Sequence, residues 1–270
     1  MYKAFYHLKE NPFSITADPG FYFSSPKHEE AFSHLKYGIM NRKGIIVISG
    51  EIGTGKTTLC RILLNKLDKT VKTALILNPS FTDLQLLNLI LKDLGITGKF
   101  KNKFDLMNAL NDFLIEETNK NHNVVLIIDE AQNLKPRQLE QIRMLSNLET
   151  EKEKLLQIIL VGQPELNYML NLPELTQLNQ RIFVRYHLAP LEKADMSDYI
   201  HHRIKIASHS LPCKITFSSK ALEQIYQLSN GTPRLVNILC DRALLAGFIA
   251  ESTVIDENMV QNSAEEVFIK

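Results

Sequence analysis

Four short runs of branched apolar residues stand out along the chain, and polar residues do not alternate with them. The runs are Ile45–Ile48, Ala74–Leu77, Val124–Ile128 and Leu156–Val161. Runs of this length and composition are typical of strands that are buried on both faces of a parallel sheet. A fifth, weaker run at Phe183–Leu188 contains polar residues, and we predict that it forms a fifth strand.

Stretches with helical spacing separate these runs. Apolar residues recur at steps of three and four over 59–67 and again over 86–94. This spacing places one apolar stripe along each helix. Strands that alternate with helices predict an α/β fold, in which helices cover both faces of the sheet.

The pattern changes near Pro190, where strand-like runs stop and helix boundary signals begin. Asp195 can cap a helix that ends near His209, and Ser218 or Ser219 can cap a second that ends near Asn230. Thr232 and Pro233 open a third helix through about Phe248, and Asp256 begins a fourth. We predict an N-terminal lead-in segment at 1–43 packing on the core, a core at 44–190 and a small helical domain at 191–270.

Composition narrows the class of protein. The chain has 270 residues with 31 basic and 30 acidic side chains, and its formal net charge of +1 excludes binding of nucleic acid by bulk charge. Three dispersed cysteines indicate a reducing compartment without a disulfide framework. The N-terminus lacks a signal-peptide pattern, and no apolar run approaches the ~20 residues of a membrane span. We therefore expect a cytoplasmic protein that does not insert into a membrane.

A phosphate-binding sequence follows the first strand directly. It consists of Gly50, Glu51, Ile52, Gly53, Thr54, Gly55, Lys56, Thr57 and Thr58. This is the pattern G-x-x-x-x-G-K-[ST] between a strand and a helix, where backbone N–H groups and the helix dipole converge on phosphates. We expect Lys56 to reach the β- and γ-phosphates of ATP and the Thr57 hydroxyl to bind Mg²⁺.

Two carboxylates end the third strand. Asp129 and Glu130 follow Val124–Ile128, which places them at the carboxyl edge of the sheet where open α/β folds bind ligands. We expect Asp129 to hold Mg²⁺ through water and Glu130 to polarise an attacking water. A pair that only caps the next helix is the alternative, which the loop at 50–58 disfavours.

For four other polar residues the sequence pattern alone does not determine a role. Gln163 follows the fourth strand, where it can contact the γ-phosphate or the water, or act only as a turn residue. Arg181, Arg185 and Arg234 can supply a guanidinium to phosphoryl transfer. Surface arginines are common, and spacing alone does not select among these three.

In this order the motifs resemble those of an AAA+ ATPase of the ExeA/GspA family, which is associated with type II secretion. The resemblance covers nearly the whole chain, and its most specific stretches are Asp129–Leu134 (DEAQNL) and Val161–Leu166 (VGQPEL). It also includes the segments 1–13, 50–58, 178–182 and 231–237. It implies a three-layer αβα P-loop core with a parallel five-stranded sheet, followed by a small α-helical lid domain.

The resemblance also implies roles for individual residues. Gln163 becomes the first sensor residue, Arg181 the arginine finger and Arg234 the second sensor, while Arg185 competes with Arg181. Pro12 and Phe13 would lie near the adenine. An arginine finger acts on the nucleotide of a neighbouring subunit, so a homo-oligomer, a ring or spiral formed with ATP, is expected.

Two biological roles compete. The first is a motor or assembly ATPase of a type II secretion or related envelope system, which implies secretion proteins as partners and a place at the inner face of the inner membrane. Secretion members of the family commonly continue into a membrane anchor, so the chain is either an excised domain or a short member. The second is a DNA-bound regulator of transposition or replication like the related TniB/TnsC-type ATPases. Lys99, Lys101 and Lys103 around Phe100 favour it slightly, although a solvated loop is the simpler interpretation.

Overall fold

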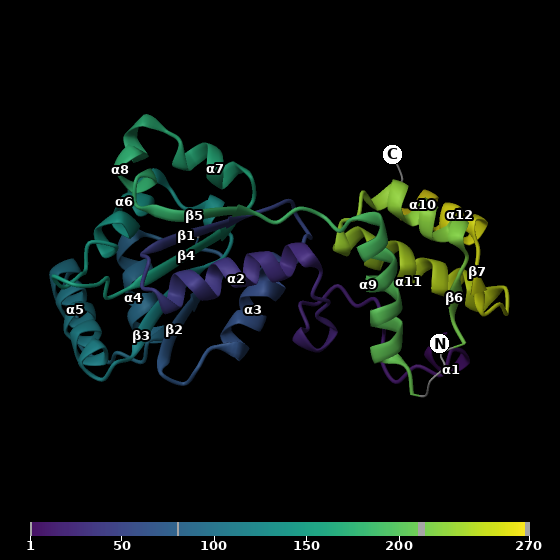
Figure 1. Cartoon of the computed structure of the whole chain (residues 1–270), viewed down its shortest axis with the longest axis horizontal. Helices are drawn as coiled ribbons and strands as arrows, with labels where there is room; N and C mark the ends of the chain where they lie inside the picture. Colours follow the sequence, from purple (N-terminus) through teal and green to yellow (C-terminus); the bar gives the residue numbers. More distant parts are fainter. Residues whose placement is uncertain (1, 80, 210–213, 268–270) are drawn as a thin grey trace. The chain divides into compact units, whose positions relative to one another are not determined.

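A computed structural model describes residues 2–79, 81–209 and 214–267 of the chain (Figure 1). Cys213, one of the three cysteines, lies outside these residues, while Cys60 and Cys240 are free and buried. Contacts divide the chain into two compact units. The sheet unit comprises His28–Ile52 and Leu59–Leu188, and the helical unit comprises Met1–Lys27, Gly53–Thr58 and Ala189–Lys270.

The sheet unit contains five parallel strands in the order β2-β3-β4-β1-β5. The strands are β1 (Ile45–Ser49), β2 (Val71–Ile76), β3 (Asn123–Ile128), β4 (Gln157–Gly162) and β5 (Ile182–His187). β1 and β4 are buried along their whole length, which explains why their sequences are apolar without alternation. The predicted sheet is confirmed, and the interrupted fifth run is its edge strand, with every second side chain exposed.

Successive side chains of each strand point to opposite faces of the sheet, and each face has its own core. Ile46 and Ile48 pack with α2 and α3, whereas Ile45 and Val47 pack with the helices of the other face. The helices are α2 (Pro26–Met40), α3 (Lys56–Lys66), α4 (Asp83–Asp93), α5 (Lys103–Asn119), α6 (Pro136–Leu145), α7 (Glu165–Leu170) and α8 (Thr176–Asn179), with 3₁₀ turns η2 (Ala131–Asn133) and η3 (Pro173–Leu175). This is the three-layer αβα arrangement that was expected.

The helical unit packs around one apolar cluster of its own. Its elements are α1 (Tyr2–Phe5), η1 (Pro19–Phe21), α9 (Lys193–Ala207), β6 (Thr216–Phe217), α10 (Ser219–Ser229), α11 (Pro233–Ile249), β7 (Val254–Ile255) and α12 (Glu257–Val267). Ser218 caps α10 by accepting a hydrogen bond from the Ala221 N–H at 3.1 Å. Among the described helices, none has both the length and the apolar character that a membrane crossing requires.

Two details of this unit differ from the sequence prediction. The N-cap of α9 is Glu192, and Asp195 lies in the first turn instead, where a carboxylate also suits the positive end of the helix dipole. β6 and β7 pair in parallel, although strands were not expected after Pro190. Each strand has two residues, which is too short to produce a recognisable apolar run.

The N-terminal segment belongs to the helical unit. The side chains of Tyr6, Phe13 and Phe21 are buried in the same cluster as α9–α11. The buried guanidinium of Arg203, a residue of α9, joins the N-terminal segment to that helix. It donates hydrogen bonds to the Pro12 carbonyl at 2.5 Å and to the Ser14 carbonyl at 3.0 Å. We expected segment 1–43 to pack on the core, so its first half differs from that expectation, while α2 does cover the sheet. The domain boundaries themselves stay a prediction.

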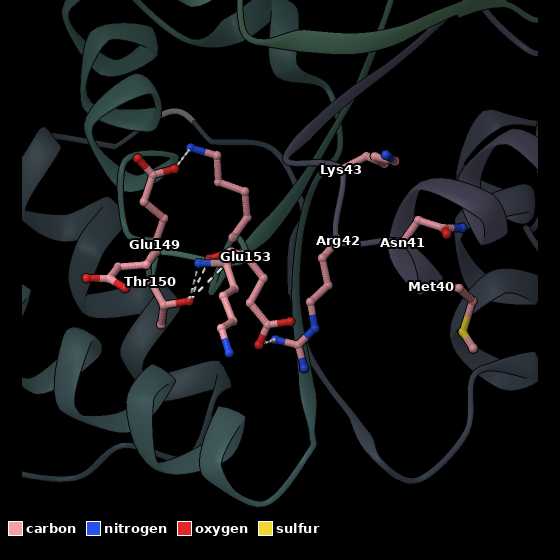
Figure 2. Close-up of a pocket in the computed structure, with 10 residues that line it drawn as sticks. Met40, Asn41, Arg42, Lys43, Glu149, Thr150 and Glu153 are labelled. Atoms are coloured by element: carbon pink, nitrogen blue, oxygen red, sulfur yellow. Dashed lines mark hydrogen bonds and ion pairs between the residues drawn. The ribbon is translucent and has the colours of Figure 1, made fainter.

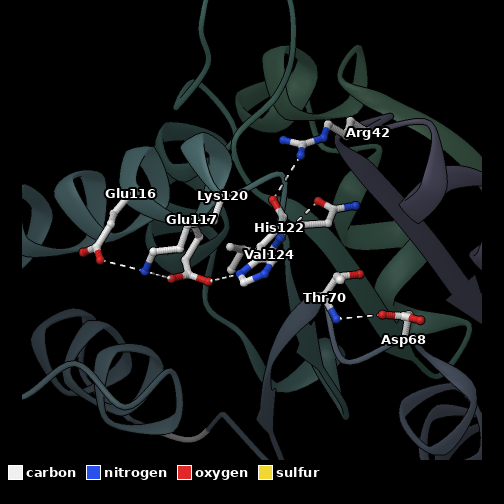
Figure 3. Close-up of polar contacts among 9 residues, drawn as sticks. Arg42, Asp68, Thr70, Glu116, Glu117, Lys120, His122 and Val124 are labelled. Carbon is white, nitrogen blue, oxygen red and sulfur yellow. Dashed lines mark hydrogen bonds and ion pairs between the residues drawn. The ribbon is translucent and has the colours of Figure 1, made fainter.

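Buried polar contacts hold the turn between α5 and β3 (Figure 3). The Glu117 carboxylate, on a side chain only 6% exposed, contacts His122 Nδ1 at 2.7 Å and Lys120 Nζ at 3.0 Å. The His122 carbonyl in turn accepts a hydrogen bond from Arg42 at 3.0 Å. These contacts fix the chain directly before β3.

We expect Glu117→Gln to destabilise the protein at pH 7 by about 1–3 kcal/mol, the range for hydrogen bonds to a buried charged group. The hydrogen bonds from His122 and Lys120 lower the pKa of Glu117 despite its burial. A lowered pKa means that this stabilisation is present above the unfolded-state pKa and is lost as pH falls through the folded-state pKa. Acid should therefore destabilise the wild type more than the variant, as measured by urea unfolding between pH 7 and pH 3.

Glu116→Gln is the matched control. Glu116 is the neighbouring residue and pairs with the same Lys120, but its side chain is 66% exposed. An exposed pair of this kind contributes little to stability, so this variant should unfold like the wild type. Equal losses in both variants would contradict a special role for Glu117.

Candidate active site

The loop at 50–58 leaves the carboxyl end of β1 and leads into α3. Gly53 and Gly55 have φ angles of +83° and +98°, a left-handed region that strains any residue with a side chain. Thr54 is fully buried and Lys56 is 7% exposed, while Glu51 and Ile52 are exposed. The expected order of strand, glycine-rich turn and helix N-terminus is thus present.

Arg234 contacts this loop within the helical unit. Its backbone N–H donates a hydrogen bond to the Gly53 carbonyl at 3.2 Å. A Cβ atom at Gly53 would lie 2.5 Å from the Arg234 Cβ, so the two backbones approach more closely than a side chain at position 53 would allow. The structure therefore places the residue expected as second sensor beside the phosphate-binding sequence.

Asp129 and Glu130 lie at the carboxyl end of β3. Asp129 is 2% exposed, and its N–H donates to the Ile76 carbonyl at 2.9 Å. Glu130 is a non-glycine residue in the left-handed region, with φ 53° and ψ 38°, which costs about 1–3 kcal/mol and is often found at functional sites. The Glu130 N–H donates to Asp129 Oδ1 at 2.9 Å, which supports this conformation.

Gln163 and Gln132 both reach the Glu130 carboxylate. Gln132 Nε2 donates to Glu130 Oε2 at 2.5 Å, and Gln163 Nε2 donates to the same oxygen at 3.3 Å. The Gln163 N–H donates to Gln132 Oε1 at 3.1 Å. The ends of β3 and β4 therefore bring Glu130 and Gln163 together, and they add Gln132, to which the sequence analysis assigned no role.

A second group of polar residues, which was not predicted from the sequence, lies where β1 ends. The buried Ser49 hydroxyl accepts a hydrogen bond from Asn167 Nδ2 at 2.9 Å and lies 3.2 Å from His187 Nδ1. These contacts connect the last residue of β1 to α7 and to β5, directly before the loop. No motif spacing indicates them, because only the sheet brings the three residues together.

Arg181 lies at the amino ends of the strands, whereas the loop at 50–58 begins at their carboxyl ends. It precedes Ile182, which pairs with Ile45, so it stands level with the amino end of β1. With a rise of about 3.3 Å per residue, Arg181 lies roughly 20 Å from Gly50 along the strand direction. The Arg181 guanidinium makes no hydrogen bond or ion pair with the residues that the structure describes, whereas Arg185 donates to Asn179 Oδ1 at 2.6 Å.

A cavity of about 730 Å³ opens at this amino edge (Figure 2). Segments 40–43, before β1, and 149–154, before β4, line it. Arg42 pairs with Glu153 at 3.1 Å, and Lys154 pairs with Glu149. Lys154 mainly, and Arg181 to a smaller extent, lower the pKa of the Glu149 carboxyl. Arg181 therefore stands in a mixed field of cations and carboxylates at the amino ends of the strands.

Pro12 and Phe13, expected near the adenine, lie in the core of the helical unit. The Phe13 ring is 2% exposed and contacts Phe217 edge-on at 6.5 Å, while the Pro12 carbonyl accepts the Arg203 hydrogen bond. A ring buried this way has no open face for stacking in this conformation. Their role in nucleotide binding stays a prediction.

Thr57 and Asp129 are suitable Mg²⁺ ligands by their chemistry. A hydroxyl and a carboxylate are hard oxygen donors, and Mg²⁺ in proteins is commonly held by one or two such groups while keeping several waters. Asp129 is buried in the sheet unit and Thr57 is half-buried in the first turn of α3. The side chains present therefore fit the metal that the loop implies.

The lysine-rich stretch offers less to a nucleic acid than its sequence indicated. Phe100 packs against the apolar core of the sheet unit, and the Lys101 N–H donates to the Asp105 carboxylate at 2.9 Å. The exposed side chains of Lys99, Lys101 and Lys103 remain, but the aromatic ring between them is not a stacking platform.

A comparison with known protein families matches the part of the chain that contains this site. A family model described as an AAA domain matches residues 39–170, which include both the loop and the carboxylates. This match, the parallel sheet, the loop after β1 and the adjacent carboxylates after β3 together indicate an AAA-type ATPase domain.

At the level of sequence, general secretion pathway protein A from Aeromonas hydrophila is 43% identical over 275 residues. The match covers 99% of this chain but 48% of that protein, so the chain spans about half of its length. The chain therefore contains an AAA domain, and it is similar to this secretion protein along almost its whole length.

Solved structures share the fold at low sequence identity. Cdc6p from Pyrobaculum aerophilum is 21% identical with a TM-score of 0.70, covering 92% of this chain and 70% of that one. The Aeropyrum pernix ORC2 protein in its ADP form is 16% identical with a TM-score of 0.68, covering 96% and 73%. The Thermotoga maritima RuvB Holliday junction branch migration motor is 18% identical with a TM-score of 0.60, covering 90% and 70%. The likeness to these three concerns the fold.

Proposed function

We propose that this chain binds ATP at the loop 50–58 and hydrolyses it to ADP and phosphate with the help of Mg²⁺. Lys56 would contact the β- and γ-phosphates, and Thr57 and Asp129 would hold the metal, which neutralises charge on the phosphates. Glu130 would accept the proton of the attacking water. The observation that carries the proposal is the Glu130 carboxylate, which two amide groups hold at the sheet edge from which the loop departs.

We further propose that Arg181 acts on the nucleotide of a neighbouring subunit, so the active form is a homo-oligomer. The strand geometry supports this role, because roughly 20 Å separates Arg181 from the loop of its own chain. Arg185 is held by Asn179, which makes Arg181 the better candidate. Gln163, at the end of β4, would contact the γ-phosphate, and Arg234 would act as the second sensor beside Gly53.

The biological role that we propose is an assembly or motor ATPase of a type II secretion or related envelope system. Identity of 43% to general secretion pathway protein A supports this role. Secretion proteins as partners and a cytoplasmic location at the inner membrane are parts of the same proposal. The alternative, a DNA-bound regulator, gains no support from the lysine-rich stretch, since Phe100 packs into the core.

Phosphate release from ATP tests both parts of the proposal. We expect turnover with Mg²⁺ and its loss when EDTA removes the metal, because the phosphate charges are then not neutralised. Added duplex DNA should leave the rate unchanged at both low and high salt. Wild-type protein that binds ATP without turning it over would contradict the enzymatic function, and strong salt-sensitive stimulation by DNA would contradict the secretion role.

A further inference from the structure

Gln132 uses both ends of its side-chain amide. The Nε2 group donates to Glu130 Oε2 at 2.5 Å, while Oε1 accepts the Gln163 N–H at 3.1 Å. Gln163 Nε2 closes the ring on the same Glu130 oxygen at 3.3 Å. Residues that directly follow β3 and β4 thus form a ring of three hydrogen bonds.

This ring determines how the amide is oriented. If the Gln132 amide were reversed, its oxygen would face the Glu130 carboxylate and its NH₂ group would face the Gln163 N–H, so both contacts would become repulsive. Only one orientation satisfies both neighbours. Because hydrogen bonds to ionised groups are the stronger ones, the short contact to the carboxylate contributes most to this preference.

The backbone leaves little space around the amide. A Cβ atom at position 162 would lie 2.8 Å from Gln132 Oε1 and 3.2 Å from the Gln132 backbone nitrogen. Glycine at the last position of β4 is therefore what allows the amide to lie against that strand. Position 132 is half-buried, so the neighbouring strand restricts its movement.

We propose that Gln132 is a positioning residue that holds the Glu130 carboxylate for water activation and couples it to the end of β4. This inference rests on the proposed ATP hydrolysis. Within the described part of the chain both hydrogen bonds to the carboxylate fall on Oε2, and Oε1 accepts none. Oε2 is the anchored oxygen, and Oε1 is the oxygen that takes the proton from water.

The coupling follows from the two roles of Gln163. When its side-chain amide turns to a γ-phosphate, Glu130 loses the 3.3 Å hydrogen bond but keeps the 2.5 Å bond from Gln132. Gln132 remains attached to the Gln163 backbone by the 3.1 Å bond. The carboxylate therefore keeps its position during the step in which the sensor side chain is used elsewhere.

Gln132→Leu tests this role. Leucine fills similar space without hydrogen bonds, and we expect kcat to fall about tenfold to a hundredfold while affinity for a non-hydrolysable ATP analogue stays within about twofold.

Gly162→Ala is a second, independent way to displace the Gln132 amide from the Glu130 carboxylate. Its added methyl group competes with the Gln132 amide for space, so kcat should fall while analogue binding persists. The double variant with Gln132→Leu should be no slower than the slower single variant, because both changes remove one interaction. Asn133→Ala is the control, since Asn133 is an exposed residue of the same turn whose amide contacts Asn78 at 3.4 Å.

The outcomes separate this inference from the proposed function. No turnover by the wild type would remove the ATPase proposal itself. Wild-type turnover that Gln132→Leu retains in full, or additive losses in the double variant, would each overturn the positioning role. Parallel losses of kcat, analogue affinity and melting temperature in Gln132→Leu would show a structural role only and would also overturn it.

Discussion

Lys56→Ala is expected to weaken ATP binding by about a hundredfold or more and to abolish measurable turnover. Lys56 is the first residue of α3 and is 7% exposed, so little of its side chain is open to solvent. A positive charge at this position offsets the β- and γ-phosphate charges, and charge-assisted hydrogen bonds of this kind are the strong ones. Isothermal titration with an ATP analogue and a phosphate-release assay measure the two effects.

Lys66→Ala is the matched control for this prediction. Lys66 ends the same helix and stands over the Phe32 ring at 5.0 Å, away from the loop. The Lys66→Ala protein should bind and hydrolyse ATP like the wild type. If Lys56→Ala bound and hydrolysed ATP at wild-type levels, the phosphate-binding role of the loop would be wrong.

Arg181→Ala should reduce turnover about a thousandfold, as expected for an arginine finger, with nucleotide affinity changed only a few-fold. Glu130→Gln should reduce turnover about a hundredfold or more through loss of the general base.

If Arg181 acts between subunits, the inactive Arg181→Ala and Glu130→Gln proteins complement each other. A Glu130→Gln subunit supplies Arg181 to a neighbour that retains Glu130. In a random 1:1 mixture such interfaces make up about a quarter of the total, and about a quarter of the wild-type rate should return.

The double variant Arg181→Ala/Glu130→Gln is the control for mixing. Paired with either single variant it creates no interface that has both groups, so no activity should return. An Arg185→Ala protein that is inactive by itself and regains activity when mixed with Glu130→Gln would transfer the finger role to Arg185. An absence of recovery in any mixture, together with a monomeric mass in the presence of ATP, would contradict the proposed oligomer.

The sheet could be predicted because both of its faces are buried. β1, β3 and β4 must be apolar at nearly every position, and this leaves a clear trace in the sequence. The loop at 50–58 could be predicted because phosphate binding needs specific residue types at fixed spacing between a strand and a helix. Local requirements of this kind are visible in a single sequence.

The contacts of the site could be predicted only in part. Gln132 is two residues from Glu130, but its role depends on the approach of β4 at Gly162, which the spacing does not reveal. The left-handed backbone of Glu130 was equally unexpected, because glutamate has no preference for that region. The burial of Phe13 by the helical unit depends on residues about 200 positions away and has no local signal.

The helical unit is built from both ends of the chain, and this has a consequence for the order of folding. The Tyr6 hydroxyl donates to the Leu244 carbonyl across a separation of 238 residues. During synthesis at about 5–20 residues per second, the first segment must wait roughly 10–50 seconds for its partners to emerge. The sheet unit, whose strands all lie before Leu188, can form in that interval. Tyr6, Phe13 and Phe21 are meanwhile exposed apolar surface on a nascent chain, which is the stage at which aggregation or chaperone binding is most favoured.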